Sequence, residues 1–360
     1  MDAKKTAMYD CHVELGGNMV EYAGWWLPSE FTGLVDEHNA VRNDVGIFDV
    51  SHMGEFFITG PDTIKFNNYI LSNDITKVEN GQCQYSILLN ENGGVVDDLL
   101  VFKYSDEKVL WVPNGANTDK DYDWVMARKD GFDVEIENAS SSYSEVALQG
   151  PKSKELLQKV VDVNLDELEN FHFVDDVTLD GKKVMISRTG YTGELGYEIY
   201  CDWEDGDDIW MKLVELGAKP CGLGCRDTLR FEASMPLYGN EMDEENSPLE
   251  AGLKFAIDFN KDDFVGKEAL EKKLEGGLER KLIGLELKGK GIPRHGYAVL
   301  KDGKEIGKIT TGYLAPTVGK PIANVIIDAE EAVIGNEVEV QIRKRVVPAV
   351  LISKRYLQKK

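Results

Sequence analysis

The stretch from Ser86 to Val101 constrains the fold most strongly, because two apolar runs flank a turn. The segment Asn92–Gly94 contains residues that tolerate positive φ angles, as a two-residue hairpin turn requires. Residues 86–89 run into this turn and residues 95–101 run out of it, both with the composition of buried strands. We therefore predict a β-hairpin with a two-residue turn at this position.

Two adjacent carboxylates, Asp97 and Asp98, interrupt the outgoing strand of this hairpin. Because successive side chains of a strand point to opposite faces, one should point to solvent and the other inward. An ionised carboxylate that faces a core is costly unless it is paired or used in chemistry. Two interpretations remain open: a structural Asp that caps a neighbouring turn, or a functional acid.

Length and charge limit the classes of function. A chain of 360 residues predicts two or three domains. Its 41 Lys and Arg stand against 64 Asp and Glu, and the net charge of −23 disfavours nucleic acid as a partner, because phosphate binding needs a basic face. No apolar run is long enough for a transmembrane helix, and the first residues do not resemble a signal peptide. We therefore expect a cytoplasmic protein that does not associate with membranes.

The charge is unevenly distributed along the chain. Residues 281–360 carry a net charge of +7, whereas residues 1–280 carry −30. A basic C-terminal module on an acidic body suggests a site for an acidic partner or a polyanionic substrate tail, and simple compensation between domains is the alternative. The same segment is rich in predicted strands with regular Gly turns, so we predict a small all-β module, a barrel or a jelly roll.

The five cysteines are odd in number and scattered. Cys221 and Cys225 are the one close pair, and no further His or Cys follows them until His295. We therefore predict reduced thiols, neither a disulfide framework nor a metal site.

A glycine-rich segment follows the predicted strand 184–188. Gly190, Gly193 and Gly196 would let the backbone approach a ligand closely, while Tyr191 offers a stacking ring and Glu198 a bidentate acceptor. The spacing does not fit the GxGxxG pattern, and no βαβ unit follows, so we reject a dinucleotide-binding fingerprint.

Four further polar residues stand at predicted element ends. Arg226 lies in the first turn of a predicted helix and can bind an anion, although a surface ion-pair helix is the alternative. Asn114 and Asn117 lie at a strand-to-helix corner, where amides either cap the helix or face a ligand. For His52 we favour a structural hydrogen-bonding role, because Ser and Asp neighbours in sequence do not make a triad.

Taken together, these motifs resemble the T-protein of the glycine cleavage system, a family of aminomethyltransferases that use tetrahydrofolate. The resemblance covers essentially the whole chain. The segments that carry it are Phe48–Gly54, Gly93–Leu99, Leu148–Pro151, Ser187–Glu194, Gly222–Gly224, Arg226–Arg230 and Gly291–Tyr297. At Pro113, Gly115 and Cys225 the chain departs from the residues usual in the family.

The resemblance implies an α+β fold of three domains around a central folate cavity: two mixed antiparallel-sheet and helix domains and a C-terminal β-barrel or jelly roll. On this basis residues 1–54 with 146–260 form a discontinuous folate-binding domain. Residues 55–145 form the second domain, and residues 281–360 form the barrel, with a linking helix over 261–280.

The resemblance also implies an enzyme, a tetrahydrofolate-dependent aminomethyltransferase of glycine catabolism. It would transfer the methylene carbon from the aminomethyl-lipoyl arm of the H-protein to tetrahydrofolate, releasing ammonia and giving 5,10-methylenetetrahydrofolate. Asp98 would be the catalytic acid and Asp97 structural. The residues that match the family's folate contacts and pocket lining are Met53, Tyr85, Asn114, Tyr191, Glu198 and Arg226.

The implied partners are the lipoylated H-protein and tetrahydrofolate, with no metal. Two alternatives stay open. One is a folate-dependent demethylase of a small methylated compound. The other is a non-catalytic folate-binding relative that supports iron–sulfur cluster assembly, although the Lys-Gly-Cys-Tyr signature of those relatives is not present in this sequence.

Overall fold

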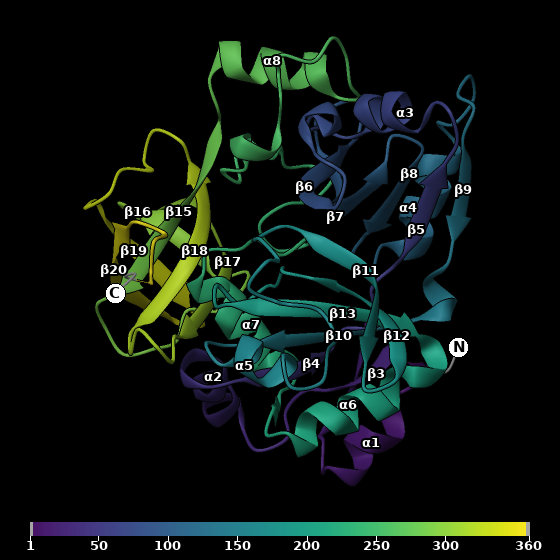
Figure 1. Cartoon of the computed structure of the whole chain (residues 1–360). Coiled ribbons are helices and arrows are strands. Elements are labelled where there is room, and N and C mark those ends of the chain that lie inside the picture. Colours follow the sequence, from purple (N-terminus) through teal and green to yellow (C-terminus); the bar gives the residue numbers. More distant parts are fainter. Residues whose placement is uncertain (1–2, 358–360) are drawn as a thin grey trace. The chain divides into compact units, whose positions relative to one another are not determined.

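The computed structural model describes residues 3–357 (Figure 1). Residues 1–2 and 358–360 lie outside this range. The prediction that the chain has no signal peptide falls partly on the first two of these residues. The chain divides into two compact units. The first unit comprises residues 1–70, 74–86 and 99–229, and the second comprises residues 71–73, 87–98 and 230–360. Within the described residues, no helix is long and apolar enough to cross a membrane.

Within residues 3–357 the strands form four sheets, and the strands of each sheet are given in the order in which they lie side by side. The first, of three strands, contains β1 (Lys4–Lys5), β3 (Trp25–Pro28) and β2 (Met19–Tyr22). A six-stranded sheet contains β11 (Phe173–Leu179), β12 (Lys182–Ser187), β13 (Gly196–Asp202), β10 (Tyr143–Gln149), β4 (Gly46–Asp49) and β14 (Lys219–Pro220). A five-stranded sheet contains β6 (Gln82–Leu89), β7 (Val95–Ser105), β8 (Lys108–Val112), β5 (Phe56–Thr59) and β9 (Glu135–Asn138). The fourth sheet is a barrel of β15 (Arg280–Leu287), β18 (Pro321–Asp328), β17 (Lys304–Leu314), β16 (Ala298–Lys301), β19 (Glu337–Ile342) and β20 (Arg345–Ile352).

Helices accompany the open sheets. They are α1 (Tyr9–Glu14), α2 (Leu34–Asn43), α3 (Thr63–Ile70), α4 (Thr118–Met126), α5 (Ser153–Leu157), α6 (Gly206–Glu215), α7 (Leu223–Glu232) and α8 (Lys267–Gly276). Short 3₁₀ turns cover Ile75–Lys77, Ser140–Ser142, Trp203–Asp205 and Lys254–Ala256. Beside the five-stranded sheet lie α3 and α4 (Figure 1), joined to it by the Trp111 indole N–H, which donates to Asn67 at 2.7 Å, and by an edge contact of Tyr122 with Phe56.

The six-stranded sheet packs apolar side chains from both of its faces. On one face Ile47, Val146 and Leu148 form a core with Trp210 and Leu213 of α6. Alternation along β4 and β10 sends their other residues to the opposite face. This second face is the one that carries the candidate site.

Two apolar clusters cover that second face. Phe48 and Ala147 pack with Val41 of α2 and Leu229 of α7. Farther along the sheet, Tyr200 and Met185 pack with Phe102 of β7 and Cys83 of β6, among others. Met53 contacts both clusters. Any side chain on this face between the two clusters is therefore enclosed by protein.

The predicted hairpin forms, but its turn is longer than predicted. The strands β6 and β7 are neighbours in the sheet, and five residues, 90–94, lie between them. Of the turn's two glycines, Gly93 has φ +78°, while Gly94 is needed for space. A Cβ at Gly94 would lie 1.8 Å from the carbonyl oxygen of Glu244. The prediction of a two-residue turn was wrong because the Asn90 side chain organises a wider loop. Its Oδ1 accepts hydrogen bonds from the backbone N–H groups of Asn92 and Gly94.

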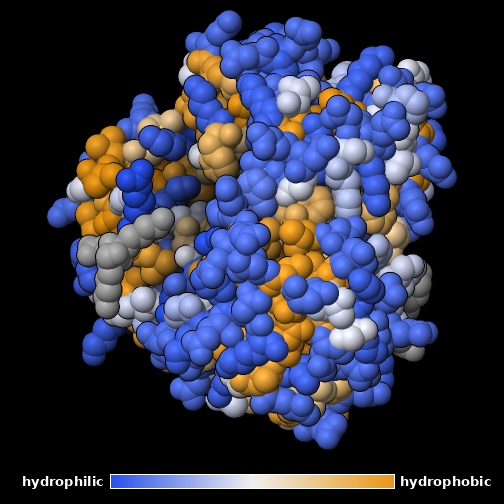
Figure 2. Space-filling model, in the orientation of Figure 1, coloured by the Kyte–Doolittle hydropathy of each residue, from blue (hydrophilic) through white to orange (hydrophobic). Residues whose placement is uncertain are grey.

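The C-terminal segment is a closed six-stranded barrel, which confirms the predicted all-β module and makes it a barrel. Its interior is filled by alternating aliphatic residues such as Leu285, Val325 and Val340, as a small barrel requires. The fold class of mixed sheet-and-helix parts with a C-terminal barrel is also confirmed. The three domain boundaries and the central cavity stay predictions. The surface seen in Figure 2 is mostly hydrophilic, with a few apolar patches.

Candidate functional site

The site is built around Glu198 on the second face of the six-stranded sheet. Register places Glu198 of β13 opposite Ala147 of β10 and Ser187 of β12. Its side chain is 6% exposed and lies between the two apolar clusters. Burial raises the pKa of the Glu198 carboxyl, while a hydrogen bond from Thr189 and the charge of Arg226 lower it in part. The carboxyl group is therefore enclosed but supported by two neighbours.

Arg226 in α7 supplies the positive charge of this site. Its guanidinium lies 4.9 Å from the ring centroid of Tyr191, a cation–π contact. Its Nη1 is buried and has no hydrogen-bond partner in the structure. A buried guanidinium nitrogen without an acceptor is costly, so it points to an acceptor supplied by a ligand. Of the two interpretations left open for Arg226, the structure favours anion or acceptor binding over a surface ion pair.

Two more carboxyl groups face the same enclosed region. Glu145 on β10 pairs with Tyr200, and Glu55 precedes β5. Burial raises the pKa of Glu55. The pKa of Glu145 is raised by burial and by the charges of Glu198 and Glu55. One oxygen of Glu145 and both oxygens of Glu55 have no hydrogen-bond partner. Neither residue was predicted from the sequence.

His52 also lies within this region. Burial and the charge of Arg226 lower the pKa of His52 to about 4, so its imidazole is neutral at physiological pH. Its Nδ1 is buried without a hydrogen-bond partner, and the ring makes an edge contact with Tyr22 at 5.8 Å. The predicted hydrogen bond is therefore not formed at Nδ1, and a structural hydrogen-bonding role at Nε2 stays a prediction.

Two glycines of the glycine-rich segment make room for a side chain of the protein itself, while the predicted close approach to a ligand stays a prediction. A Cβ at Gly190 would lie 2.1 Å from the side chain of Gln149, and one at Gly196 would lie 2.3 Å from it. Gln149 in turn accepts from Thr192 Oγ1 at 2.8 Å and donates to the Thr189 carbonyl at 3.3 Å. Two of the three glycines therefore make room for Gln149, which fixes the loop that holds Thr189 beside the carboxyl of Glu198.

Met53 and Asn114 lie in two loops that are held together. The Gly54 N–H donates to the Pro113 carbonyl at 3.1 Å, and a Cβ at Gly115 would lie 2.2 Å from the carbonyl oxygen of His52. Both Met53 and Asn114 are half-buried. In the same corner Asn117 is the N-cap residue of α4, but its side chain makes no capping hydrogen bond.

Tyr85 and Asp98 are the remaining predicted site residues. Tyr85 is half-buried on β6 in the first unit. Asp98 belongs to the second unit, where β7 begins; it is half-buried, whereas Asp97 is fully buried. The opposite exposure of the two carboxylates fits the predicted alternation. The first unit thus brings Tyr191, Glu198 and Arg226 together, and the grouping of Asp98 with them stays a prediction.

One group of side chains in the first unit could hold a metal ion. Glu37, Cys221 and Cys225 each place one ligand atom within 4.8 Å of the others, and all three residues are buried. The Glu37 carboxylate already accepts from four backbone N–H groups, those of residues 31, 32, 33 and 222. All five cysteines are free thiols, and burial raises the pKa of Cys225 strongly. These hydrogen bonds explain why Glu37 is buried, because its carboxylate holds the backbone of two loops. The predicted absence of a metal stays a prediction.

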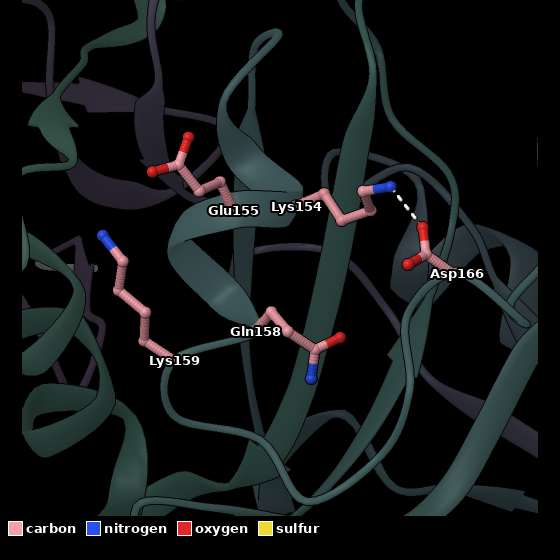
Figure 3. A pocket seen from close by; sticks show the side chains of 5 residues that line it. All are labelled: Lys154, Glu155, Gln158, Lys159 and Asp166. Atoms are coloured by element: carbon pink, nitrogen blue, oxygen red, sulfur yellow. Dashed lines mark hydrogen bonds and ion pairs between the residues drawn. The ribbon is translucent and has the colours of Figure 1, made fainter.

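The surface of the first unit also carries an open hollow outside this region (Figure 3). It is lined by Lys154, Glu155, Gln158, Lys159 and Asp166. Lys154 pairs with Asp166, while Glu155 and Lys159 point away from that pair. None of the predicted site residues lines it, and its side chains are exposed, so it has no feature of a buried binding site.

A signal for Glu145 is nevertheless present in the sequence. Residues 146–148 are an apolar run, and β10 begins three residues before it, at Tyr143. Alternation extended back from Ala147 places Glu145 on the same inward face, where a carboxyl group is unexpected. Glu55 similarly stands directly before an apolar run, residues 56–58.

Comparison with known proteins identifies the family of this chain. Residues 8–261 match the family model of the GCVT N-terminal domain, and residues 280–357 match that of the glycine cleavage T-protein C-terminal barrel domain. Aminomethyltransferases of Thermoanaerobacter pseudethanolicus and Clostridium botulinum strain Langeland are 48% and 49% identical to the chain; each match covers at least 99% of this chain and 98% of the relative. The crystal structure of glycine cleavage system aminomethyltransferase T from Bartonella henselae matches with a TM-score of 0.92 at 29% identity, over 98% of both chains. The chain therefore belongs to the glycine cleavage T-protein family of aminomethyltransferases.

Proposed function

We propose that this protein transfers a one-carbon unit from the aminomethyl-lipoyl arm of an acidic carrier, the H-protein, to tetrahydrofolate, with release of ammonia. The observation that supports this most strongly is the buried Glu198 carboxylate beside an Arg226 nitrogen without a partner. A carboxylate can accept two N–H donors, and a guanidinium can donate to a carbonyl or anionic oxygen. The pterin edge of a folate offers both kinds of group, so the residues present fit that ligand.

Each predicted residue has a role in this proposal. Glu198 binds the aminopyrimidinone edge, Tyr191 provides a wall, and Arg226 donates to an acceptor of the ligand. Tyr85, Met53 and Asn114 line the remaining pocket. Bound tetrahydrofolate supplies the nitrogen that accepts the carbon.

Asp98 is the proposed catalytic residue. Positive charge develops on the transferred carbon as ammonia leaves, and a fixed carboxylate nearby lowers the barrier electrostatically. The same carboxylate can orient or relay the proton that the accepting nitrogen loses. Asp97, which is fully buried, stays structural in this scheme.

The basic barrel provides the proposed contact with the acidic carrier. Residues 281–360 carry a net charge of +7 on a chain of net charge −23. Complementary charge accelerates association and makes it sensitive to salt.

Ammonia release from aminomethylated carrier, measured with and without tetrahydrofolate, tests the proposal. We expect fast release that requires folate and yields methylenetetrahydrofolate. A panel of small N-, O- and S-methyl compounds replaces the carrier in a parallel assay. Turnover of one of these donors without the carrier would instead identify a demethylase, and binding of folate without any turnover would identify a non-catalytic relative.

A further inference from the structure

Glu145 lies next to Glu198, although no contact between them was expected from the sequence. Register pairs Glu145 with Tyr200 and Ala147 with Glu198, so the two carboxyl groups are diagonal neighbours on one face of adjacent strands. Diagonal neighbours lie roughly 7–8 Å apart, within reach of long side chains. Glu145 is 2% exposed, so water does not screen the interaction.

The groups around Glu145 carry more potential negative than positive charge. Facing it are Glu198 and Tyr200 of β13, Glu55 before β5 and Arg226 of α7. Cys83 of β6 raises the pKa of Tyr200, the charge of Glu198 raises the pKa of Cys83 after burial, and the His52 imidazole is neutral. Three carboxyl groups thus share a single guanidinium. Like charges in one buried site do not all ionise, so at least one carboxyl group keeps its proton.

Hydrogen bonding decides which carboxyl group carries the charge. Glu198 accepts from Thr189, which favours its ionised form. Glu145 has an oxygen without a partner, and its pKa is raised by burial, by Glu198 and by Glu55, against smaller opposing effects of Arg226 and Tyr200. The proton therefore lies on Glu145, or on Glu55, which no hydrogen bond supports either.

We propose that Glu145 is a positioning residue that stays protonated while Glu198 is ionised, so that one negative charge meets the N–H edge of the bound folate. This inference rests on the proposed function. When Glu145 loses its proton at higher pH, the site carries a second negative charge beside Glu198, and a bound ligand would bury both charges away from water. The bound state therefore requires the proton on Glu145, so folate affinity falls on the alkaline side as Glu145 ionises and on the acid side as Glu198 is protonated.

Calorimetric titration with 5-formyltetrahydrofolate between pH 6 and pH 9.5 tests this inference. We expect the affinity of the wild-type protein to fall at the alkaline end, by up to about tenfold per pH unit once Glu145 titrates. Glu145→Gln is a neutral isostere of the protonated acid. It should bind within about twofold of wild type at neutral pH and lose the alkaline fall. The same alkaline fall in Glu145→Gln would overturn the inference.

Glu55→Gln is the matched control, because it removes the other unsupported buried carboxyl of the cluster. The fall in folate affinity at alkaline pH should persist in Glu55→Gln. If the fall instead disappears in Glu55→Gln and persists in Glu145→Gln, the proton lies on Glu55 and the inference is overturned. Glu145→Met keeps the position neutral and should also lack the fall, which covers the case that Glu145→Gln does not fold. If wild type binds but shows no alkaline fall, this inference fails alone; if wild type does not bind 5-formyltetrahydrofolate at all, the proposed function fails with it.

Discussion

At Glu198, neighbouring protein groups support a carboxyl group that is almost completely buried. Thr189 donates to it, and Thr189 is itself held by Ser187 at 2.5 Å on the same sheet. Arg226 adds a positive charge that favours the ionised form. A ligand with N–H donors gains the full strength of a charged acceptor at this position, because no water competes for it.

Glu198→Gln should weaken folate binding without changing the fold. The variant replaces one acceptor oxygen by an NH₂ group that opposes the ligand's donors. Hydrogen bonds to charged groups contribute about 1.5–3 kcal/mol, so the Kd should rise about tenfold to a hundredfold. Isothermal titration with 5-formyltetrahydrofolate measures it, and Glu204→Gln, an exposed position of the same unit, serves as the control. Unchanged affinity in Glu198→Gln would remove Glu198 from the site.

The Glu145 carboxyl should make stability depend on pH in a defined direction. Its pKa is raised in the folded state, so between its unfolded value near pH 4.3 and its folded value the native state binds more protons than the unfolded state. Stability must then fall as pH rises through that range. Glu145→Gln should therefore gain thermal stability over wild type at pH 8 and gain little at pH 4. A gain of equal size at both pH values would contradict the shift.

Asp49 shows the opposite behaviour. Burial raises its pKa, but hydrogen bonds from His12, from Thr6 and from the Ser51 N–H outweigh burial and hold the pKa below its ordinary value. Its contribution to stability is therefore present above about pH 4 and is lost as pH falls through the lower folded value. Asp49→Asn should unfold at a lower temperature than wild type at pH 7, and the difference should shrink below pH 4. Thermal unfolding monitored by circular dichroism across this range measures the effect.

At the scale of elements, close backbone approach positions the loops that carry site residues. Gly115 lets the end of β8 contact the loop that carries His52 and Met53. Gln149 similarly requires glycine at positions 190 and 196. These glycines act through space and not through unusual φ angles, since none of the three has a positive φ.

Gly115→Ala should destabilise the first unit, because its Cβ would lie 2.2 Å from the carbonyl oxygen of His52. Overpacking of this kind costs about 1–3 kcal/mol. Gly276→Ala at the end of α8 is the matched control, since a Cβ there meets nothing within 4 Å. Thermal unfolding should show a lower midpoint for Gly115→Ala and an unchanged or slightly higher one for Gly276→Ala. Equal midpoints for the two variants would show that the loop adapts without cost.

Local patterns predicted the elements better than the contacts between them. The strands around the hairpin and the C-terminal all-β module follow from the residue pattern and the turn residues, and the structure has them. The need for glycine at position 94 depends on Glu244, and the role of Gly190 depends on Gln149. Both partners are distant in sequence, and no local pattern identifies them. For the same reason the sequence did not predict that Glu37 lies beside Cys221 and Cys225.

For the molecule as a whole, the uneven charge is the property that bears on partner binding. The C-terminal barrel, residues 280–357 in the family match, coincides with the basic segment. In the proposed function the acidic remainder would repel the acidic carrier, and the basic barrel would attract it.

Charge reversal in the barrel should weaken recognition of the carrier. Lys344 in the turn between β19 and β20 and Arg345 at the start of β20 are both exposed. Lys344→Glu with Arg345→Glu should raise the KM for aminomethylated carrier about three- to tenfold at low salt, leave kcat unchanged, and lose this effect at high salt. The control reverses two exposed lysines of the first unit, Lys152 and Lys159. An equal rise in KM in the control would show that net charge matters and the barrel surface does not.

Single-turnover transfer by Asp98→Asn tests the central claim most directly, because it isolates the proposed catalytic carboxylate. The amide keeps the size of the side chain but removes its charge. We predict that the transfer rate from aminomethylated carrier to tetrahydrofolate falls roughly tenfold or more, while the folate Kd stays within about threefold of wild type. A transfer rate close to that of wild type would contradict the assignment of Asp98 as the catalytic residue.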